Sequence, residues 1–524
     1  MSRRTTDAAE RARRRPGGRA HCVLAVVWAL GQVVGLFAEA VAAQPTLVLR
    51  PVTTVLHAHS TWSSGALSLE DLVAHARSRN VEAVFLAENH LQRFEYGLPP
   101  LRGLLRHRVE YPSILLKGPE AFLAAVHAAN QKQRDVLIIP GVETVPHYYW
   151  TGNLLGGTLT MHNAQKNILA LGLSHAEDYR GLPVVGSDGS SRWGLESLWL
   201  LSPLLLAICG VWLLQVKRRR VIRLRHFRVA EERRLIGPGV LCLAAGLLLL
   251  ANNYPFRPSS VSPYDAAAGL APHQNVIDFV AARDGVSVWS LPEARDHQAV
   301  TVAGLRATLR TEPYPSDLLR TDRFTAFGGI YEDTTTFTEP GQGWDQLLLE
   351  FLHGRRNAPA WAVGEAAYHF DGQAGKRFGD VQTVVLAERK DAGSVLEGLR
   401  AGRAYALLRT PEEGLVLDRF QAISADAPPA EAGSLLTLRA GARPEIHAVV
   451  GTAGGKRLPI EVRLIRSGAV VQTLRGDTPL ALRWTDAPLA KGSKSFFRLD
   501  IRGAGGHRLL SNPVFLTALR EGRP

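Results

Sequence analysis

Cysteine is scarce in this sequence. Only three cysteines occur among 524 residues, at Cys22, Cys209 and Cys242, and each lies inside a long apolar run. No cysteine pair is left to form a disulfide in the polar parts of the chain, and no thiolate is available there for catalysis or for zinc binding. Metal chemistry in those parts must use histidine and carboxylate side chains.

A broad basic surface is also lacking, although the formal net charge is +13. Residues 1–19 carry seven arginines against two acidic residues, and residues 217–234 carry nine basic residues against two acidic ones. These blocks, with net charges of +5 and +7, account for nearly all of the total. The remaining chain is close to neutral and has no basic face to follow phosphates, so we expect no nucleic-acid partner.

Both basic blocks adjoin apolar runs. The first block precedes residues 22–38 and then a small-residue run at 40–45, which is typical of a signal peptide or N-terminal anchor over residues 1–43. The second block lies between residues 198–216 and 235–251, each uncharged and just long enough to cross a bilayer. The positive-inside rule places both blocks in the cytoplasm.

The sequence therefore predicts a transmembrane hairpin over 197–252 in a bacterial inner membrane, with a basic cytoplasmic loop. The parts on either side of the hairpin would lie in the periplasm. The alternative is that the two apolar runs are core helices of a soluble domain, which would require a solvated arginine-rich loop inside a packed domain.

Apolar strands alternate with helical stretches over residues 44–196, and the same rhythm resumes over 253–414. Such alternation favours a parallel sheet or a closed barrel with active groups at the carboxyl ends of the strands. Over residues 415–524 short alternating strands take over, with a turn at Ser467-Gly468. We predict one α/β domain that is interrupted by the hairpin and followed by a small all-β sandwich.

One predicted strand carries two imidazoles. Side chains alternate along a strand, so His57 and His59 point the same way and could bind one metal ion. A turn follows, then a helix that we expect Ser68 to cap. The next apolar strand, residues 83–87, ends at Glu88, so metal-capable side chains stand at the exit of both strands of a βαβ unit.

Acceptors recur at the ends of later strands, at Glu143 in Pro140-Gly141-Val142-Glu143 and at His369. Together with the two histidines and Glu88, this arrangement resembles the PHP family, named for polymerase and histidinol phosphatase. The resemblance covers about residues 52–410 and is closest to membrane-associated bacterial relatives with a C-terminal sandwich. It implies a distorted (β/α)7 barrel and hydrolysis of phosphoesters with bound metal ions.

The chain departs from the family pattern at several ligand positions. Family ligands are replaced at Ser64, Asn89, Asn167, Leu291 and Ala367, and Glu88 takes the place of an aspartate. The positions that match outright are His57, His59, Glu143 and His369. The resemblance implies that the first three belong to one metal pocket, with His369 a further ligand. His90, His147 and His162 are the candidates to replace lost ligands.

Two histidines and a carboxylate suffice for a first-row divalent metal and leave positions open for water and substrate. We therefore expect one ion at most, of manganese, zinc or iron. Glu88 or His369 could act as the general base if either lies within hydrogen-bond reach.

The sequence leaves three interpretations of function open. The first is an exported, membrane-anchored, metal-dependent phosphoesterase with a reduced metal site. The second is a catalytically degenerate binding or scaffold protein of the cell envelope, because the replacements fall on ligand positions while fold landmarks such as Trp344-Asp345 persist. In a third interpretation the sandwich would be the working part and bind an envelope partner.

Overall fold

The structure is a computed structural model that describes residues 48–519, apart from 155, 224–227, 303–304, 332–334, 411–412 and 426. The chain divides into two units, Met1–Leu49 and Arg50–Pro524. The predicted signal peptide or anchor over residues 1–43 lies outside the described residues.

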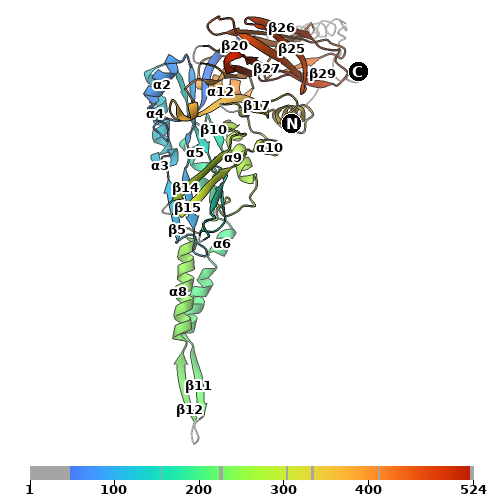
Figure 1. Cartoon of the computed structure of the whole chain (residues 1–524). Helices are drawn as coiled ribbons and strands as arrows, with labels where there is room; N and C mark the ends of the chain where they lie inside the picture. Colours follow the sequence, from blue (N-terminus) through green and yellow to red (C-terminus); the bar gives the residue numbers. More distant parts are fainter. Residues whose placement is uncertain are drawn as a thin grey trace, which may run out of the picture. The chain divides into compact units, whose positions relative to one another are not determined.

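The second unit has a mixed α/β architecture built on a large sheet that is rich in parallel pairs (Figure 1). Short strands at the centre of this sheet are β1 (Arg50–Ala58), β2 (Ala83–Leu86), β3 (Glu88–Asn89), β6 (Leu137–Ile139), β7 (Gly141–Thr144), β10 (Ile168–Leu171), β13 (Val286–Trp289), β16 (Ala326–Ile330) and β17 (Trp361–Tyr368). The pairs β1–β2, β2–β6, β3–β7, β13–β16, β16–β17 and β17–β1 are parallel. Strand β10 runs antiparallel to both β7 and β13.

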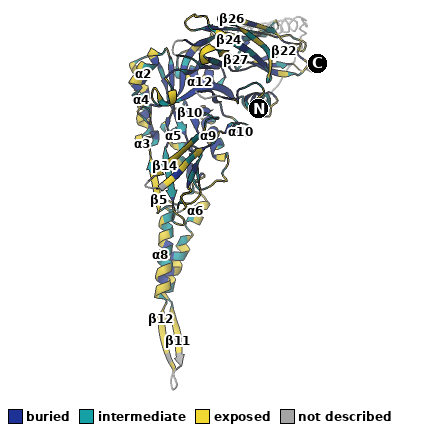
Figure 2. Ribbon diagram, viewed as in Figure 1, coloured by how far each residue is buried: buried dark blue, intermediate teal, exposed yellow. Residues whose placement is uncertain are grey.

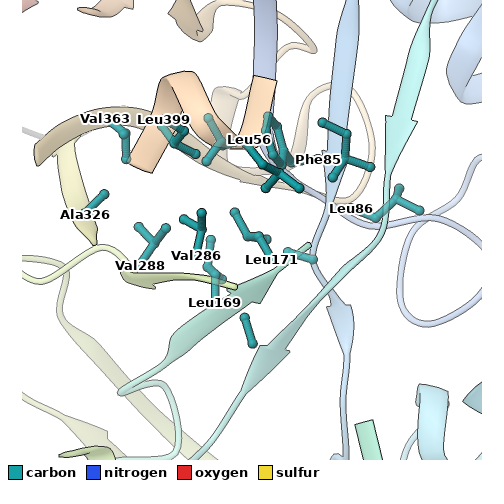
Figure 3. Close-up of a cluster of buried hydrophobic side chains, with 14 of the residues drawn as sticks. Leu56, Phe85, Leu86, Leu169, Leu171, Val286, Val288, Ala326, Val363 and Leu399 are labelled. Atoms are coloured by element: carbon teal, nitrogen blue, oxygen red, sulfur yellow. The ribbon is translucent and has the colours of Figure 1, made fainter. Parts of the chain in front are cut away.

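These central strands are short apolar runs that are buried on both faces, as expected for strands covered by helices. Leu56, Phe85, Leu169 and Val288 are completely buried in one cluster between the strands and the surrounding helices (Figure 3). Polar residues occur at the ends of these strands, where they form the candidate site.

Helices cover the strands where their apolar faces can be buried. They are α2 (Leu69–Ser78), α3 (Ile114–Lys117), α4 (Pro119–Lys132), α5 (Ala176–Gly181), α9 (Ala271–Ala281), α10 (Pro315–Leu318), α11 (Gly343–Leu352) and α12 (Ala392–Arg400). The predicted cap of α2 is confirmed: the Ser68 hydroxyl accepts a hydrogen bond from the amide of Asp71 at 3.1 Å.

Helices α6 (Glu196–Leu200), α7 (Pro203–Gln215) and α8 (Ile236–Asn253) contain the two apolar runs. The stretches Glu196–Gln215 and Ile236–Asn253 are long and apolar enough to cross a membrane. Gly210 and Gly246 let α7 and α8 approach closely, because a side chain at either position would collide with the opposite backbone. Much of the remaining surface of these helices is exposed in Figure 2, which a soluble core helix would not allow.

Strands β11 (Lys217–Arg223) and β12 (Arg228–Arg234) pair as an antiparallel ribbon between α7 and α8 (Figure 1). The basic segment predicted as a loop is therefore largely β-structure. Opposite charges face each other in its middle, where Arg219 donates to Glu232 at 2.9 Å.

Two smaller β-structures stand outside the central strands. Strands β4 (Arg93–Gly97) and β5 (Arg106–Glu110) form a two-stranded ribbon. Strands β8 (Tyr149–Thr151), β9 (Thr160–His162), β14 (Asp296–Val302) and β15 (Leu305–Thr311) form a four-stranded sheet in the order β14-β15-β9-β8. Residues 300–302 and 305–309 lie in this outer sheet, because β14 and β15 pair with each other and β15 pairs with β9.

The C-terminal part consists mainly of strands and turns, with helix α12 between β18 and β19. Its strands are β18 (Val381–Ala387), β19 (Ala404–Leu408), β20 (Leu415–Ser424), β21 (Ala427–Glu431), β22 (Leu435–Leu438), β23 (Glu445–Thr452), β24 (Pro459–Arg466), β25 (Ala469–Asp477), β26 (Leu480–Thr485), β27 (Lys494–Gly503), β28 (Arg508–Ser511) and β29 (Val514–Ala518). Strands β18 and β19 link β1 to β28 and so join this part to the central sheet. Strands β21, β20, β23 and β26 form a separate sheet whose side chains share one hydrophobic cluster with β24, β27 and β28.

The predicted turn between β24 and β25 is confirmed. Ser467 and Gly468 both have positive φ, at 48° and 92°, and they connect the paired residues Arg466 and Ala469. Two positive φ angles match the twist of a two-residue hairpin.

A buried ion pair joins α11 to β27. Arg498 is fully buried and donates from Nε and Nη2 to the two carboxylate oxygens of Asp345, at 2.6 and 2.8 Å. Its guanidinium also lies over the Trp344 ring, 4.5 Å from the centroid. The Trp344-Asp345 landmark therefore connects the α/β part to the C-terminal strands.

Replacing one partner of this pair should destabilise the protein, because the other charge would stay buried without compensation. We expect Asp345→Asn to lower the free energy of unfolding by about 3–5 kcal/mol, measured by chemical denaturation of the full-length protein. Glu461→Gln is the control, since it breaks an ion pair with the exposed Arg475 and should cost less than about 0.5 kcal/mol. Equal effects of the two substitutions would contradict a structural role for the buried pair.

Candidate metal centre

The two histidines of the H-x-H motif lie at the end of β1, but simple strand alternation does not orient them. The register of β1 against both β2 and β17 shifts between residues 55 and 58, and His57 has φ 68°. A bulge of this kind re-aims a side chain at a sheet edge, and a positive φ in a residue other than glycine is a strained conformation. The prediction that both imidazoles face one point is confirmed, although the backbone achieves it differently.

Both imidazoles face Glu143, which β7 presents 84 residues later in the chain. His57 Nε2 lies 3.3 Å from one carboxylate oxygen of Glu143, and His59 Nε2 lies 3.7 Å from the other. One ligand atom from each of the three residues fits within a mutual separation of 4.8 Å. The structure therefore brings together the three residues predicted to form one pocket.

A second layer of polar groups orients the two rings. On the far side of His57, Nδ1 lies 3.3 Å from Ser290 Oγ and 3.9 Å from Glu365 Oε2. On the far side of His59, Nδ1 lies 3.2 Å from Ser63 Oγ. Such partners set the ring orientation and leave the Nε2 atoms directed at Glu143.

Glu88 is completely buried beside this layer, and both of its carboxylate oxygens accept hydrogen bonds from serines. The amide and hydroxyl of Ser60 donate to Oε1 at 2.9 and 2.5 Å, and the Ser63 hydroxyl donates to Oε2. Ser63 therefore bridges Glu88 and His59. Gly65 makes this tight turn possible, because a Cβ at that position would lie 2.1 Å from the His59 carbonyl oxygen.

The charges of the cluster are strongly perturbed. Burial opposes the ionisation of Glu143, but the two neighbouring imidazoles outweigh it and lower the pKa of Glu143 to about 2. Burial likewise opposes protonation of His57, yet Glu143 and Glu365 raise the pKa of His57 to about 9. Burial holds the pKa of His59 well below its usual value. Without metal, the pocket holds a carboxylate, one imidazolium and one neutral imidazole.

His369 stands next to the three-residue cluster. Its ring stacks on that of His59 with the centroids 4.2 Å apart, and its Nδ1 lies 3.0 Å from Ser64 Oγ. Burial lowers the pKa of His369, so the ring is neutral near pH 7. The structure places His369 against a ligand residue, outside the group of three whose ligand atoms share one centre.

The other candidate histidines have different partners. His90 Nε2 lies 2.6 Å from the Tyr179 carbonyl oxygen, and His147 Nε2 lies 3.0 Å from that of Ser262. His162 Nε2 lies 2.7 Å from Thr151 Oγ1. None of the three belongs to the metal-capable cluster found among the described residues.

Residues at four of the five replaced ligand positions still contact the site. Asn167 donates to Glu143 Oε1 at 2.5 Å, and the Leu291 amide donates to Glu365 Oε1 at 2.5 Å. Ser64 lies between His59 and His369, and Asn89 donates to the Ser64 hydroxyl at 3.2 Å. These groups complete a hydrogen-bond network around a single pocket.

Sequence reasoning missed Glu365 and Ser290. Glu365 is completely buried in β17 and approaches His57. A signal for it existed, because a carboxylate inside an apolar strand is rare unless it is paired. Ser290 has no comparable signal, since a single serine after a strand is common.

The donor set fits a divalent metal. Among the described residues, the buried Nε2 atoms of His57 and His59 make no hydrogen bond, and neither does the Oε2 atom of Glu365 behind them. The two nitrogens face the Glu143 carboxylate at 3.3 and 3.7 Å. Buried polar atoms without partners are costly, and a shared ion would satisfy the two nitrogens and the Glu143 carboxylate together.

No protein-family model and no curated protein matches the chain. Among solved structures, it is similar to a two-domain protein from Bacteroides vulgatus described as containing a PHP-like metal-dependent phosphoesterase, at 11% identity, covering 87% of this chain and 92% of that one, with a TM-score of 0.33. It is also similar to a protein from Bifidobacterium adolescentis described as a metal-dependent phosphoesterase, at 12% identity, covering 62% and 90% of the two chains, with a TM-score of 0.26. A third similar structure is an amidohydrolase from Chromobacterium violaceum, at 13% identity, covering 46% and 66%, with a TM-score of 0.19.

Glu88 should make stability depend on pH. Burial raises the pKa of Glu88 from 4.5 to about 7 in the folded protein, so the folded state favours the protonated form. The stabilisation that comes from protonated Glu88 is fully present below pH 4.5 and is lost as the pH rises through 7. Between pH 4 and pH 8, we expect the free energy of unfolding of the wild type to fall by up to about 3 kcal/mol relative to that of Glu88→Gln.

Chemical denaturation of both proteins across this pH range, with a chelator present, measures the difference. Glu70→Gln, at an exposed position on α2, is the matched control. A difference between wild type and Glu88→Gln that stays constant with pH would contradict a carboxyl group whose pKa burial has raised.

Proposed function

We propose that this chain is a membrane-anchored, exported, PHP-like metal-dependent phosphoesterase with a reduced metal site. The observation that carries the proposal is the pair of buried, unpartnered Nε2 atoms of His57 and His59 directed at the Glu143 carboxylate. The ring of strand pairs from β1 through β17 and back to β1 supports a distorted (β/α)7 barrel around this pocket. The strands that share a core after residue 415 support a C-terminal sandwich.

His57, His59 and Glu143 would hold one divalent ion, of manganese, zinc or iron. Such an ion, when bound, polarises a phosphoryl oxygen and lowers the pKa of a water molecule. The second layer positions these ligands: Glu88 acts on His59 through Ser63, and Glu365 with Ser290 orients His57. Asn167 holds the Glu143 carboxylate by donating to Oε1.

His369 is the proposed general base. Its imidazole is neutral near pH 7 because burial lowers its pKa, and it remains partly exposed beside the cluster. A neutral imidazole next to the reacting centre can accept a proton from the attacking water. Glu88 fits this role less well, since serine donors occupy both of its oxygens.

Anchoring rests on α7 and α8. Large apolar side chains cover the outside of these helices, including Leu205, Trp212 and Leu241, which are 71%, 60% and 71% exposed. A hydrocarbon environment would bury them. The basic ribbon between the helices would then lie in the cytoplasm and the metal centre on the periplasmic side.

The metal site predicts a stoichiometry that can be measured. The full-length protein, purified with manganese, zinc or iron, should retain about one metal equivalent and hydrolyse a chromogenic phosphodiester. The double substitution His57→Ala with His59→Ala should lose both, because it removes two of three ligands. Mass spectrometry of metal content and a colorimetric assay give the two readouts.

His127→Ala, on the exposed face of α4, is the matched control and should keep both metal and turnover. Metal that stays bound in the double variant would place the ion elsewhere. A wild-type protein that binds metal without hydrolysing any phosphoester would sink the proposed activity.

The proposed role of His369 can be tested separately from metal binding. We expect His369→Asn to keep the metal and to lower kcat by about 10²–10⁴-fold, the contribution typical of a general base. Metal content and the pH dependence of kcat test this together. Loss of the metal in this variant would instead make His369 a ligand.

A further inference from the structure

A cavity outside the metal centre lies between the β4–β5 ribbon and the outer four-stranded sheet. It has a volume of about 250 Å³. Phe94 and Tyr96 of β4 line it, and their register partners Val109 and His107 of β5 do so as well. Alternation therefore gives the ribbon one largely apolar face toward the cavity.

The facing sheet is apolar on the same side. Trp150, Met161 and Leu309 are cross-strand neighbours and all line the cavity. Ala307 and Val300, which pair across β14 and β15, continue this surface. The Trp150 indole N–H already donates to the Glu95 carbonyl oxygen at 2.8 Å, so the ring offers an apolar surface to the space.

Hydrogen bonds link the lining residue Gln165 to the metal centre. Gln165 lines the cavity, and its side-chain oxygen accepts a hydrogen bond from Asn167 at 3.4 Å. The same Asn167 amide donates to Glu143. On the opposite wall, Tyr111 lines the cavity and is 49% exposed, and Asn89 donates to the carbonyl oxygen of the adjacent Pro112 at 3.4 Å.

The walls are also tied to the end of the apolar helix α8. Asn252 of α8 accepts a hydrogen bond from the Gly103 amide, in the loop of the β4–β5 ribbon, at 2.8 Å. Just beyond α8, the Tyr264 hydroxyl accepts from the Gly97 amide at 2.7 Å, and the Pro263 carbonyl accepts from the Trp150 amide at 2.9 Å. The cavity thus lies between the end of a helix suited to a bilayer and the metal centre.

We propose that this cavity binds the apolar chain of a phosphoester drawn from the membrane and directs its phosphoryl group toward the metal centre. The inference rests on the proposed phosphoesterase activity and names its substrate class: an amphiphile with one chain that enters beside α8. Most of the lining side chains are apolar or aromatic, although Gln92, Glu95 and His107 also line the cavity. Such walls suit an alkyl chain, whereas a sugar would leave most of its polar groups unpaired.

Chain-length dependence of binding tests the proposal without requiring turnover. The metal-loaded, full-length protein in lipid nanodiscs is titrated calorimetrically with ethyl, butyl and hexyl phosphate, and empty nanodiscs provide the correction for partitioning. We expect the Kd to fall about fourfold for each methylene that enters the cavity, until the cavity is full. Lysophosphatidic acid in the bilayer should compete with hexyl phosphate.

Two substitutions on neighbouring positions of β15 give a matched pair. Ala307 faces the cavity and Thr308 faces solvent, so Ala307→Phe should abolish the dependence on chain length while Thr308→Phe keeps it. Leu309→Gln, which makes the same wall polar, serves if Ala307→Phe does not fold. Thermal unfolding of each variant verifies that it is folded.

The measurements distinguish a failure of this inference from a failure of the proposed phosphoesterase function. Hydrolysis of 4-nitrophenyl alkyl phosphates at a rate independent of chain length, with binding also independent of it, would overturn the inference and leave the proposed function intact. Binding that strengthens with chain length but no hydrolysis would overturn the function and leave the cavity assignment. Lysophosphatidic acid that does not compete would overturn the membrane as the source.

Discussion

The burial of the Glu143 carboxylate is the constraint on which the site depends. A charge in that position needs compensation, and the imidazoles of His57 and His59 provide it from the end of β1. The requirement is strong enough to hold His57 at φ 68° in a bulge. In the metal-free protein a proton on His57 supplies the positive charge, since its pKa is raised to about 9. A divalent ion would take the place of that proton, so metal binding and proton release are coupled in this pocket.

Several residues at the replaced ligand positions share one feature in the structure, a contact with the metal centre. Asn167 donates to Glu143, the Leu291 amide donates to Glu365, and Ser64 lies between the rings of His59 and His369. Each residue has lost the ability to ligate an ion but retains a hydrogen bond to the site. This network suits one ion in one pocket and explains how several replacements can coexist with a well-formed centre.

Contacts beyond the centre connect it to the rest of the second unit. The ion pair between Asp345 and Arg498 attaches the C-terminal strands to α11. On another side, Asn252 of α8 holds the β4–β5 ribbon, and that ribbon walls the cavity whose inner end approaches Asn167. The apolar helices, the outer β-structures and the pocket therefore form one continuous series of contacts. In such an arrangement an anchor could also position the protein to receive a substrate from the bilayer.

Short-range chemistry is enough to specify the local elements: the H-x-H strand, the Ser68 cap, the two apolar helices and the Ser467-Gly468 turn. Motif resemblance pointed to His57, His59 and Glu143 as one pocket. How these residues meet depends on long-range contacts, because the bulge at His57 depends on the register of β1 against β2 and β17. Tertiary contacts also bring Glu365 to His57, 308 residues earlier in the chain, and place the serines that donate hydrogen bonds to Glu88. Contacts between distant strand ends depend on pairing and burial across the whole sheet, and no local pattern encodes them.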